Sequence, residues 1–154
     1  MNISDQTRKW DVRFLELARL VSTWSKDPST QVGAVIVDAD KRIVSVGYNG
    51  FPKGIEDDDA RLDNRELKYH MIIHAERNAL LFSELSRVRG GTLYTWPFPT
   101  CAPCTSIFIQ AGVARTVAPG NIPDNWRESI ILGERLKEEA NILNEVIPWL
   151  ATTL

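Results

Sequence analysis

The chain has few of the residues that cross-link small proteins or bind metals, with only two cysteines and two histidines among 154 residues. Two cysteines cannot build the several disulfides on which small secreted domains depend. Positive charge is not in excess either, because 18 Lys and Arg stand against 20 Asp and Glu. Domains that bind the nucleic-acid backbone usually carry a clear basic excess. A polynucleotide partner is therefore disfavoured.

Long apolar runs are also missing. No stretch reaches the length needed to span a bilayer, and the N-terminal sequence MNISDQTRKWDVRF lacks the apolar core of a signal peptide. We therefore expect a cytoplasmic protein without a membrane partner. Hydrophobic residues make up 44% of the chain and charged residues 25%, which is typical of soluble globular proteins. The length suits one domain with its own core, so we predict a single domain over residues 1–154.

The apolar pattern predicts alternating helices and strands. Apolar residues recur at steps of three and four over residues 8–26, which indicates an amphipathic helix. Residues 32–37 and 42–48 are rich in Val and Ile and predict an antiparallel hairpin. Residues 51–68 are polar and predict a long loop with room for a helical turn. This order of elements indicates a layered α/β domain. Further helices are expected at residues 74–85, 101–111 and 124–140, and further strands at 92–95, 113–118 and 141–146.

The two cysteines lie three residues apart, as Cys101 and Cys104. At the start of a helix they would share one face, close to the positive end of the helix dipole, which favours their thiolate forms. With His74 they supply the nitrogen and sulfur ligands that zinc prefers, and a catalytic zinc characteristically has three protein ligands and one water. A redox CxxC motif and a pair of buried thiols are the alternatives. A redox motif does not explain the separate segment His74-Ala75-Glu76.

These residues match the zinc deaminase signature H-x-E followed by P-C-x-x-C. The segments SKDPSTQVGAVIV, GYNGFPKG, HAERNAL and IQAGV resemble those of deoxycytidylate deaminases and occur in the same order. The resemblance covers most of the chain up to about residue 118. It departs from the family at Pro99-Thr100-Cys101, where one residue is inserted between the expected proline and the first cysteine. The insertion bears on the shape of the pocket wall.

The resemblance implies a three-layer α/β/α cytidine-deaminase-like fold, with a central mixed sheet of about five strands. It also implies that zinc activates a water that attacks C4 of cytosine, so that dCMP becomes dUMP and ammonia leaves. Glu76 would be the proton shuttle. Residues two apart point to opposite sides of an ideal helix, so we expect the metal to lie off the N-terminal end of the helix that follows His74. An alternative for Glu76 is a charge that only stabilises the helix N-terminus. An alternative for the metal centre includes His70 as an additional ligand.

Three residues are candidates for substrate binding. Asn49 resembles the asparagine with which the family contacts sugar and base, although an Asn-Gly pair is equally typical of a turn. Lys26 and Lys53 are candidate phosphate contacts, and a solvated surface charge is the alternative for each. The implied partner is a small-molecule nucleotide, and the implied assembly is a homo-oligomer, as a dimer or hexamer. Regulation by dCTP or dTTP is left open. The rival functions are deamination of another base, nucleotide or nucleic acid, and a non-catalytic nucleotide-binding protein of the same fold.

Overall fold

A five-stranded sheet in the order β2-β1-β3-β4-β5 runs through the computed structural model, which describes residues 5–148. The β1–β2 and β1–β3 pairs are antiparallel, and the β3–β4 and β4–β5 pairs are parallel. The sheet is therefore mixed, as predicted. The strands are β1 (Gly33–Val37), β2 (Ile43–Tyr48), β3 (Thr92–Trp96), β4 (Arg115–Pro119) and β5 (Leu143–Ile147).

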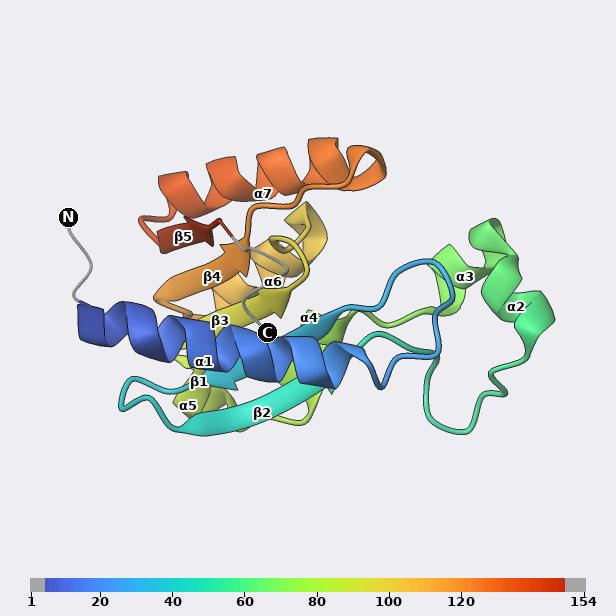
Figure 1. Cartoon of the computed structure of the whole chain (residues 1–154), viewed down its shortest axis with the longest axis horizontal. Coiled ribbons are helices and arrows are strands. Elements are labelled where there is room, and N and C mark those ends of the chain that lie inside the picture. The colour runs from blue at the N-terminus through green and yellow to red at the C-terminus, as the bar shows by residue number, and fades with distance from the viewer. Residues whose placement is uncertain (1–4, 149–154) are drawn as a thin grey trace.

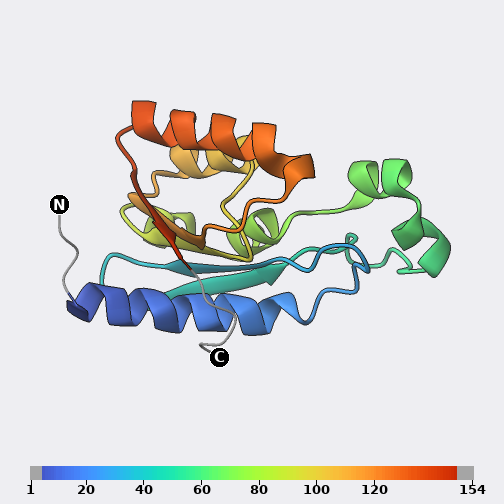
Figure 2. The ribbon, with the colours of Figure 1, turned by 45° about the horizontal axis from the view of Figure 1, so that its top comes forward.

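Helices cover both faces of the sheet (Figures 1 and 2). On one face α1 packs Phe14 and Leu15 against Val35 of β1. On the other face Ala79 of α4 and Phe108 of α6 belong to a second core, and α7 packs on α6 and β5. The predicted three-layer α/β/α arrangement is confirmed. The helices are α1 (Asp5–Ser22), α2 (Asp59–Asp63), α3 (Arg65–Met71), α4 (Ala75–Leu81), α5 (Leu85–Val88), α6 (Ala102–Ala111) and α7 (Arg127–Glu139), with a 3-10 turn, η1 (Asp124–Trp126), before α7.

β1 is apolar along its whole length because both of its faces are covered. All five of its residues are buried. Two glycines let helices approach the sheet closely: a Cβ on Gly33 would lie 1.9 Å from the carbonyl oxygen of Ala18 in α1, and one on Gly47 would lie 2.4 Å from that of Ala75 in α4. Gly47 thus allows the N-terminal end of α4 to lie directly against β2.

The predicted loop over residues 51–68 is wrong in part, because it contains α2 and the start of α3. Both helices have side-chain caps: the carboxylate of Asp58 accepts a hydrogen bond from the Arg61 amide, and the side chain of Asn64 accepts one from the Leu67 amide. Such caps stabilise short helices that have little apolar periodicity. The two helices project beyond the end of the sheet (Figure 1).

Other boundaries differ by a few residues. The first helix ends at Ser22 rather than residue 26, and the helix after His74 ends at Leu81 rather than residue 85. No helix within residues 5–148 is both long and apolar enough to cross a membrane. The single domain over residues 1–154 stays a prediction, and residues 1–4 and 149–154 lie outside the described residues.

Candidate metal centre and the cavity beside it

Two helix N-termini bring the four predicted residues together. His74 is the N-cap of α4 and Cys101 is the N-cap of α6, while Glu76 and Cys104 lie in the first turns of those helices. The potential ligand atoms of all four lie within 4.8 Å of one another. His74 has extended dihedrals, φ −65° and ψ 152°, so its side chain does not follow the helical direction. This explains how residues two apart converge at the end of α4.

The spacing of the ligand atoms suits zinc. His74 Nδ1 lies 3.5 Å from Cys101 Sγ and 3.3 Å from Cys104 Sγ. Zn–N and Zn–S bonds of about 2.0 and 2.3 Å at a tetrahedral angle place nitrogen and sulfur about 3.5 Å apart. The three side chains therefore fit three corners of one zinc tetrahedron.

One of the two thiols, that of Cys101, is set up to lose its proton. The hydrogen bond from Cys104 and, after it, the contact with His74 together lower the pKa of Cys101 to about 4, against the opposing effect of burial. The same bond and burial raise the pKa of Cys104. Hydrogen bonding to Cys101 raises the pKa of His74, while burial lowers it. The pair thus favours a thiolate at Cys101, the form in which cysteine binds metals.

Glu76 is hydrogen-bonded to Thr100, the residue between Pro99 and Cys101 at which the sequence departs from the deaminase signature. The side chain of Glu76 is 4% exposed and that of Thr100 is 3% exposed. The Thr100 hydroxyl donates a hydrogen bond to Glu76 Oε2. A buried carboxylate needs such hydrogen-bond partners in place of the water that it loses. The insertion before Cys101 therefore contacts the predicted proton shuttle directly.

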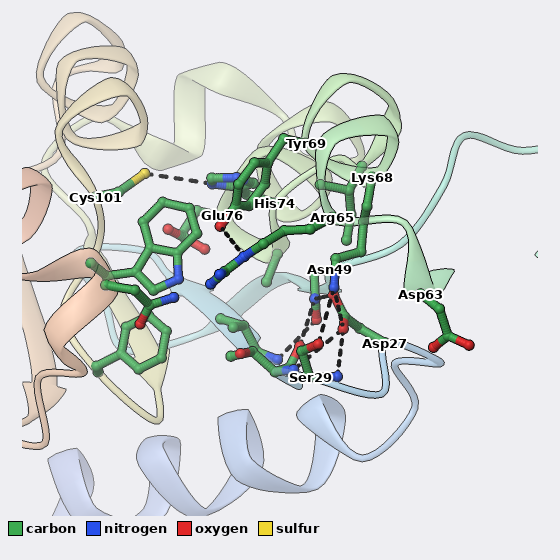
Figure 3. Close-up of a pocket in the computed structure, with 17 residues that line it drawn as sticks. Asp27, Ser29, Asn49, Asp63, Arg65, Lys68, Tyr69, His74, Glu76 and Cys101 are labelled. Carbon is green, nitrogen blue, oxygen red and sulfur yellow. Dashed lines mark hydrogen bonds and ion pairs between the residues drawn. The ribbon is translucent and has the colours of Figure 1, made fainter. Parts of the chain in front are cut away.

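A cavity of about 440 Å³ opens beside this group (Figure 3). One end is formed by His74, Glu76 and Cys101. Trp126 lies edge-on to the imidazole of His74, with 5.8 Å between ring centroids and 90° between planes. Tyr69 lies edge-on to Trp126 with centroids 6.1 Å apart. Aromatic rings beside the candidate metal centre provide flat apolar walls for a planar ligand.

The opposite wall is built around Asp27. Asp27 Oδ1 accepts hydrogen bonds from the Ser29 amide at 2.8 Å and from Lys68 Nζ at 3.0 Å. The Asn49 amide nitrogen donates to the carbonyl oxygen of Thr30 at 2.9 Å and to Asp27 Oδ2 at 3.4 Å. Asp27 and Lys68 form a buried ion pair, with side chains 5% and 8% exposed. This network joins residues 27–30 to Asn49, which follows β2, and to Lys68 of α3. It fixes the shape of the cavity wall.

The predicted substrate contacts lie in different surroundings. Asn49 is buried and lines the cavity. Lys26 and Lys53 are not among the lining residues; Lys26 is 71% exposed and pairs with Asp57 at 3.1 Å. His70 is exposed on α3 and is not part of the candidate metal group.

Sequence reasoning missed several residues that line the cavity. Arg65 and Lys68 come from the segment expected to be a loop, Tyr69 follows that segment directly, and Trp126 precedes α7. A possible signal was Asn64, whose cap indicates a helix and places Arg65, Lys68 and Tyr69 on adjacent turns. No local pattern indicates that Trp126 faces His74.

Comparisons with known proteins agree with this geometry. The model of the family described as "Cytidine and deoxycytidylate deaminase zinc-binding region" matches residues 8–119. An uncharacterized deaminase encoded in the luxG 3′ region of Aliivibrio fischeri is 41% identical over 145 residues, covering 92% of this chain and 94% of the relative. A probable deoxycytidylate deaminase of Caenorhabditis elegans is 45% identical over 106 residues, covering 67% of this chain but only 53% of the relative.

The fold also has a solved counterpart. The dCMP deaminase of cyanophage S-TIM5 superposes with a TM-score of 0.70 at 22% identity, covering 90% of this chain and 98% of the phage chain. At this identity the likeness supports the fold alone. The family match, which includes His74, Glu76 and both cysteines, shows that the chain belongs to the cytidine and deoxycytidylate deaminase family and carries its zinc-binding region.

Proposed function

We propose that the protein is a zinc-dependent enzyme that converts dCMP to dUMP and releases ammonia. The observation that carries the proposal is the set of His74, Cys101 and Cys104, together with the carboxylate of Glu76, at one end of a cavity of about 440 Å³. The C. elegans relative named as a probable deoxycytidylate deaminase supports the choice of substrate, although this chain spans about half of its length.

The proposed reaction joins the oxygen of water to C4 of cytosine and breaks the bond from C4 to the exocyclic amine. Zinc held by His74, Cys101 and Cys104 would make the attacking water more acidic. Glu76 takes the proton of that water, passes it to N3, and carries the second proton to the departing amine. Thr100 keeps the Glu76 carboxylate in one orientation through its hydrogen bond.

Asn49 is proposed to contact the substrate as an acceptor. Its two amide hydrogens are already donated to Thr30 and Asp27, and its oxygen accepts one hydrogen bond from the Val32 amide. One lone pair of the oxygen remains. A sugar hydroxyl could donate to it. Lys26 and Lys53 stay predicted phosphate contacts, and neither lies in the wall of the cavity.

The substrate is tested by measuring ammonia release from a panel of bases, nucleosides, nucleotides and single-stranded DNA. We expect dCMP to exceed deoxycytidine in kcat/KM by well over tenfold, because a charge-assisted contact to the phosphate contributes about 1.5–3 kcal/mol. Equal values for the two would argue against phosphate recognition. A preferred substrate with another base would favour the rival deaminase, and no release from any compound would favour the non-catalytic binding protein.

Thr100→Val should lower kcat for dCMP by about tenfold or more, because a hydrogen bond to a charged group contributes about 1.5–3 kcal/mol. Valine keeps the shape of threonine and removes the donor to Glu76. Thr100→Ser keeps the donor and should restore most of the rate. Thr105→Val is the matched control, since the buried Thr105 hydroxyl has no hydrogen-bond partner within residues 5–148. Equal rates for the Thr100→Val and Thr105→Val enzymes would contradict the role of Thr100.

Self-association is also proposed, as a dimer or hexamer. Leu81, Phe82 and Leu85, at the end of α4 and the start of α5, are 68%, 76% and 61% exposed. Large exposed apolar side chains close together favour contacts with another chain. Light scattering coupled to size exclusion would give the subunit number. The cytoplasmic location stays a prediction, and regulation by dCTP or dTTP stays open.

A further inference from the structure

The cavity contains two basic side chains with different surroundings. Lys68 is buried and its charge is balanced by Asp27, 3.0 Å away. Arg65 is exposed and takes part in no ion pair within residues 5–148. Asp63 also lines the cavity, but Figure 3 shows its carboxylate turned away from Arg65. Arg65 is therefore the basic side chain of the cavity whose charge is balanced by no carboxylate among the described residues.

The Arg65 side chain is held over the cavity. Its Nε donates a hydrogen bond to the Tyr69 hydroxyl at 3.1 Å, and its guanidinium carbon lies 5.8 Å from the centre of the Tyr69 ring. Figure 3 shows the side chain extending from α3 into the cavity, toward Glu76 and His74. Because Nε is used by Tyr69, the two Nη groups remain to bind a ligand, and neither has a hydrogen-bond partner in the described part of the chain.

Helix α3, which carries Arg65, is fixed by the contacts of Lys68 with Asp27 and Ser29. Lys68 Nζ donates to Asp27 Oδ1 at 3.0 Å and to the Ser29 hydroxyl at 3.3 Å. Arg65 and Tyr69 are four residues apart and therefore lie on the same side of α3. The buried ion pair thus ties α3, which carries Arg65, to Asp27, while Tyr69 packs on Trp126 beside the candidate metal centre.

We propose that Arg65 binds the phosphate of the nucleotide substrate, an inference that rests on the proposed nucleotide deamination. A guanidinium offers parallel N–H groups that match two phosphate oxygens. The base would lie at the metal end, between Glu76 and the ring of Trp126, and the phosphate beside the guanidinium of Arg65. Arg65 is then the residue that makes the site specific for a nucleotide over a nucleoside.

The test measures binding as well as turnover, with the zinc-containing full chain. Titration calorimetry gives the Kd of dUMP and of deoxyuridine, and ammonia release gives kcat/KM for dCMP and deoxycytidine. Arg65→Gln should weaken dUMP binding and lower kcat/KM for dCMP by about 10- to 100-fold, and leave both nucleosides unchanged. Arg65→Lys should keep part of the binding. Arg61→Gln, which removes an exposed arginine of α2 paired with Asp58, is the matched control and should change neither.

The outcomes separate this inference from the proposed function. Wild-type protein that binds dUMP through Arg65 without deaminating dCMP would reject dCMP deamination and leave the phosphate assignment standing. An equal loss for nucleotide and nucleoside in Arg65→Gln would overturn the assignment. So would a failure of the wild type to bind dUMP more tightly than deoxyuridine. A larger loss of dUMP binding in Lys26→Gln or Lys53→Gln than in Arg65→Gln would also overturn it, and would locate the phosphate at those lysines.

Discussion

Glu76→Gln should retain zinc and fold normally, but deaminate dCMP slower by on the order of 10⁴-fold or more. Glutamine keeps the size of the side chain and can still accept the hydrogen bond from Thr100. It cannot take a proton from water. One carboxylate is proposed to serve both the attack and the departure of the amine, so its loss should reach or exceed the upper end of what general acid–base catalysis contributes, about 10²–10⁴-fold.

Zinc content and rate have to be measured side by side on the same preparations. Glu16→Gln is a suitable control, because Glu16 is an exposed glutamate of α1, outside the cavity. It should match the wild type in both measurements. A Glu76→Gln enzyme with its zinc and with a nearly unchanged rate would remove Glu76 from the mechanism. Loss of zinc in this variant would make Glu76 a metal ligand or a structural support, which its position within 4.8 Å of the other three ligand atoms would then explain.

Much of the fold could be predicted because the spacing of apolar residues along the chain distinguishes its helices from its strands. Apolar residues recur at helical spacing in α1 because one side of this helix packs on the sheet. β1 is apolar throughout because both of its faces are covered by helices. Residues 51–68 were predicted less well, because α2 and α3 depend on caps at Asp58 and Asn64 rather than on an apolar stripe. The mixed sheet of about five strands was implied by the family resemblance, and the order of the strands was not predicted, since periodicity does not specify which strands are neighbours.

The chemical core of the site could be predicted because its residue types are rare in the chain. His74, Cys101 and Cys104 are three of only four His and Cys residues. The walls of the cavity could not be predicted in this way. A lysine in a polar segment is expected to be exposed to solvent, but the tertiary structure buries Lys68 beside Asp27, which is 41 residues away in the sequence. Trp126 comes from the segment after residue 118, where the resemblance is weak, and only the packing of α7 on α6 brings this segment to the site.

Cys101→Ala and Cys104→Ala should each reduce bound zinc from close to one per chain to near zero, and abolish deamination. The two thiols and His74 Nδ1 have the separations of a zinc tetrahedron, and removal of one ligand leaves two protein ligands where a catalytic site needs three. Metal analysis of the purified variants measures the loss. Ser106→Ala, at an exposed position of α6, is the control and should keep zinc and activity.

Zinc removal should also lower the thermal stability of the wild type, because the metal binds to the folded site and joins the N-termini of α4 and α6. A chelator should therefore lower Tm, and added zinc should restore it. In Cys104→Ala the chelator should have little further effect, since there is no metal to remove. This comparison separates loss of the ligand from damage to the core, which matters because Cys104 is completely buried. Full zinc retention in both cysteine variants, or a chelator effect on Tm as large in Cys104→Ala as in the wild type, would rule out the cysteine pair as the zinc ligands.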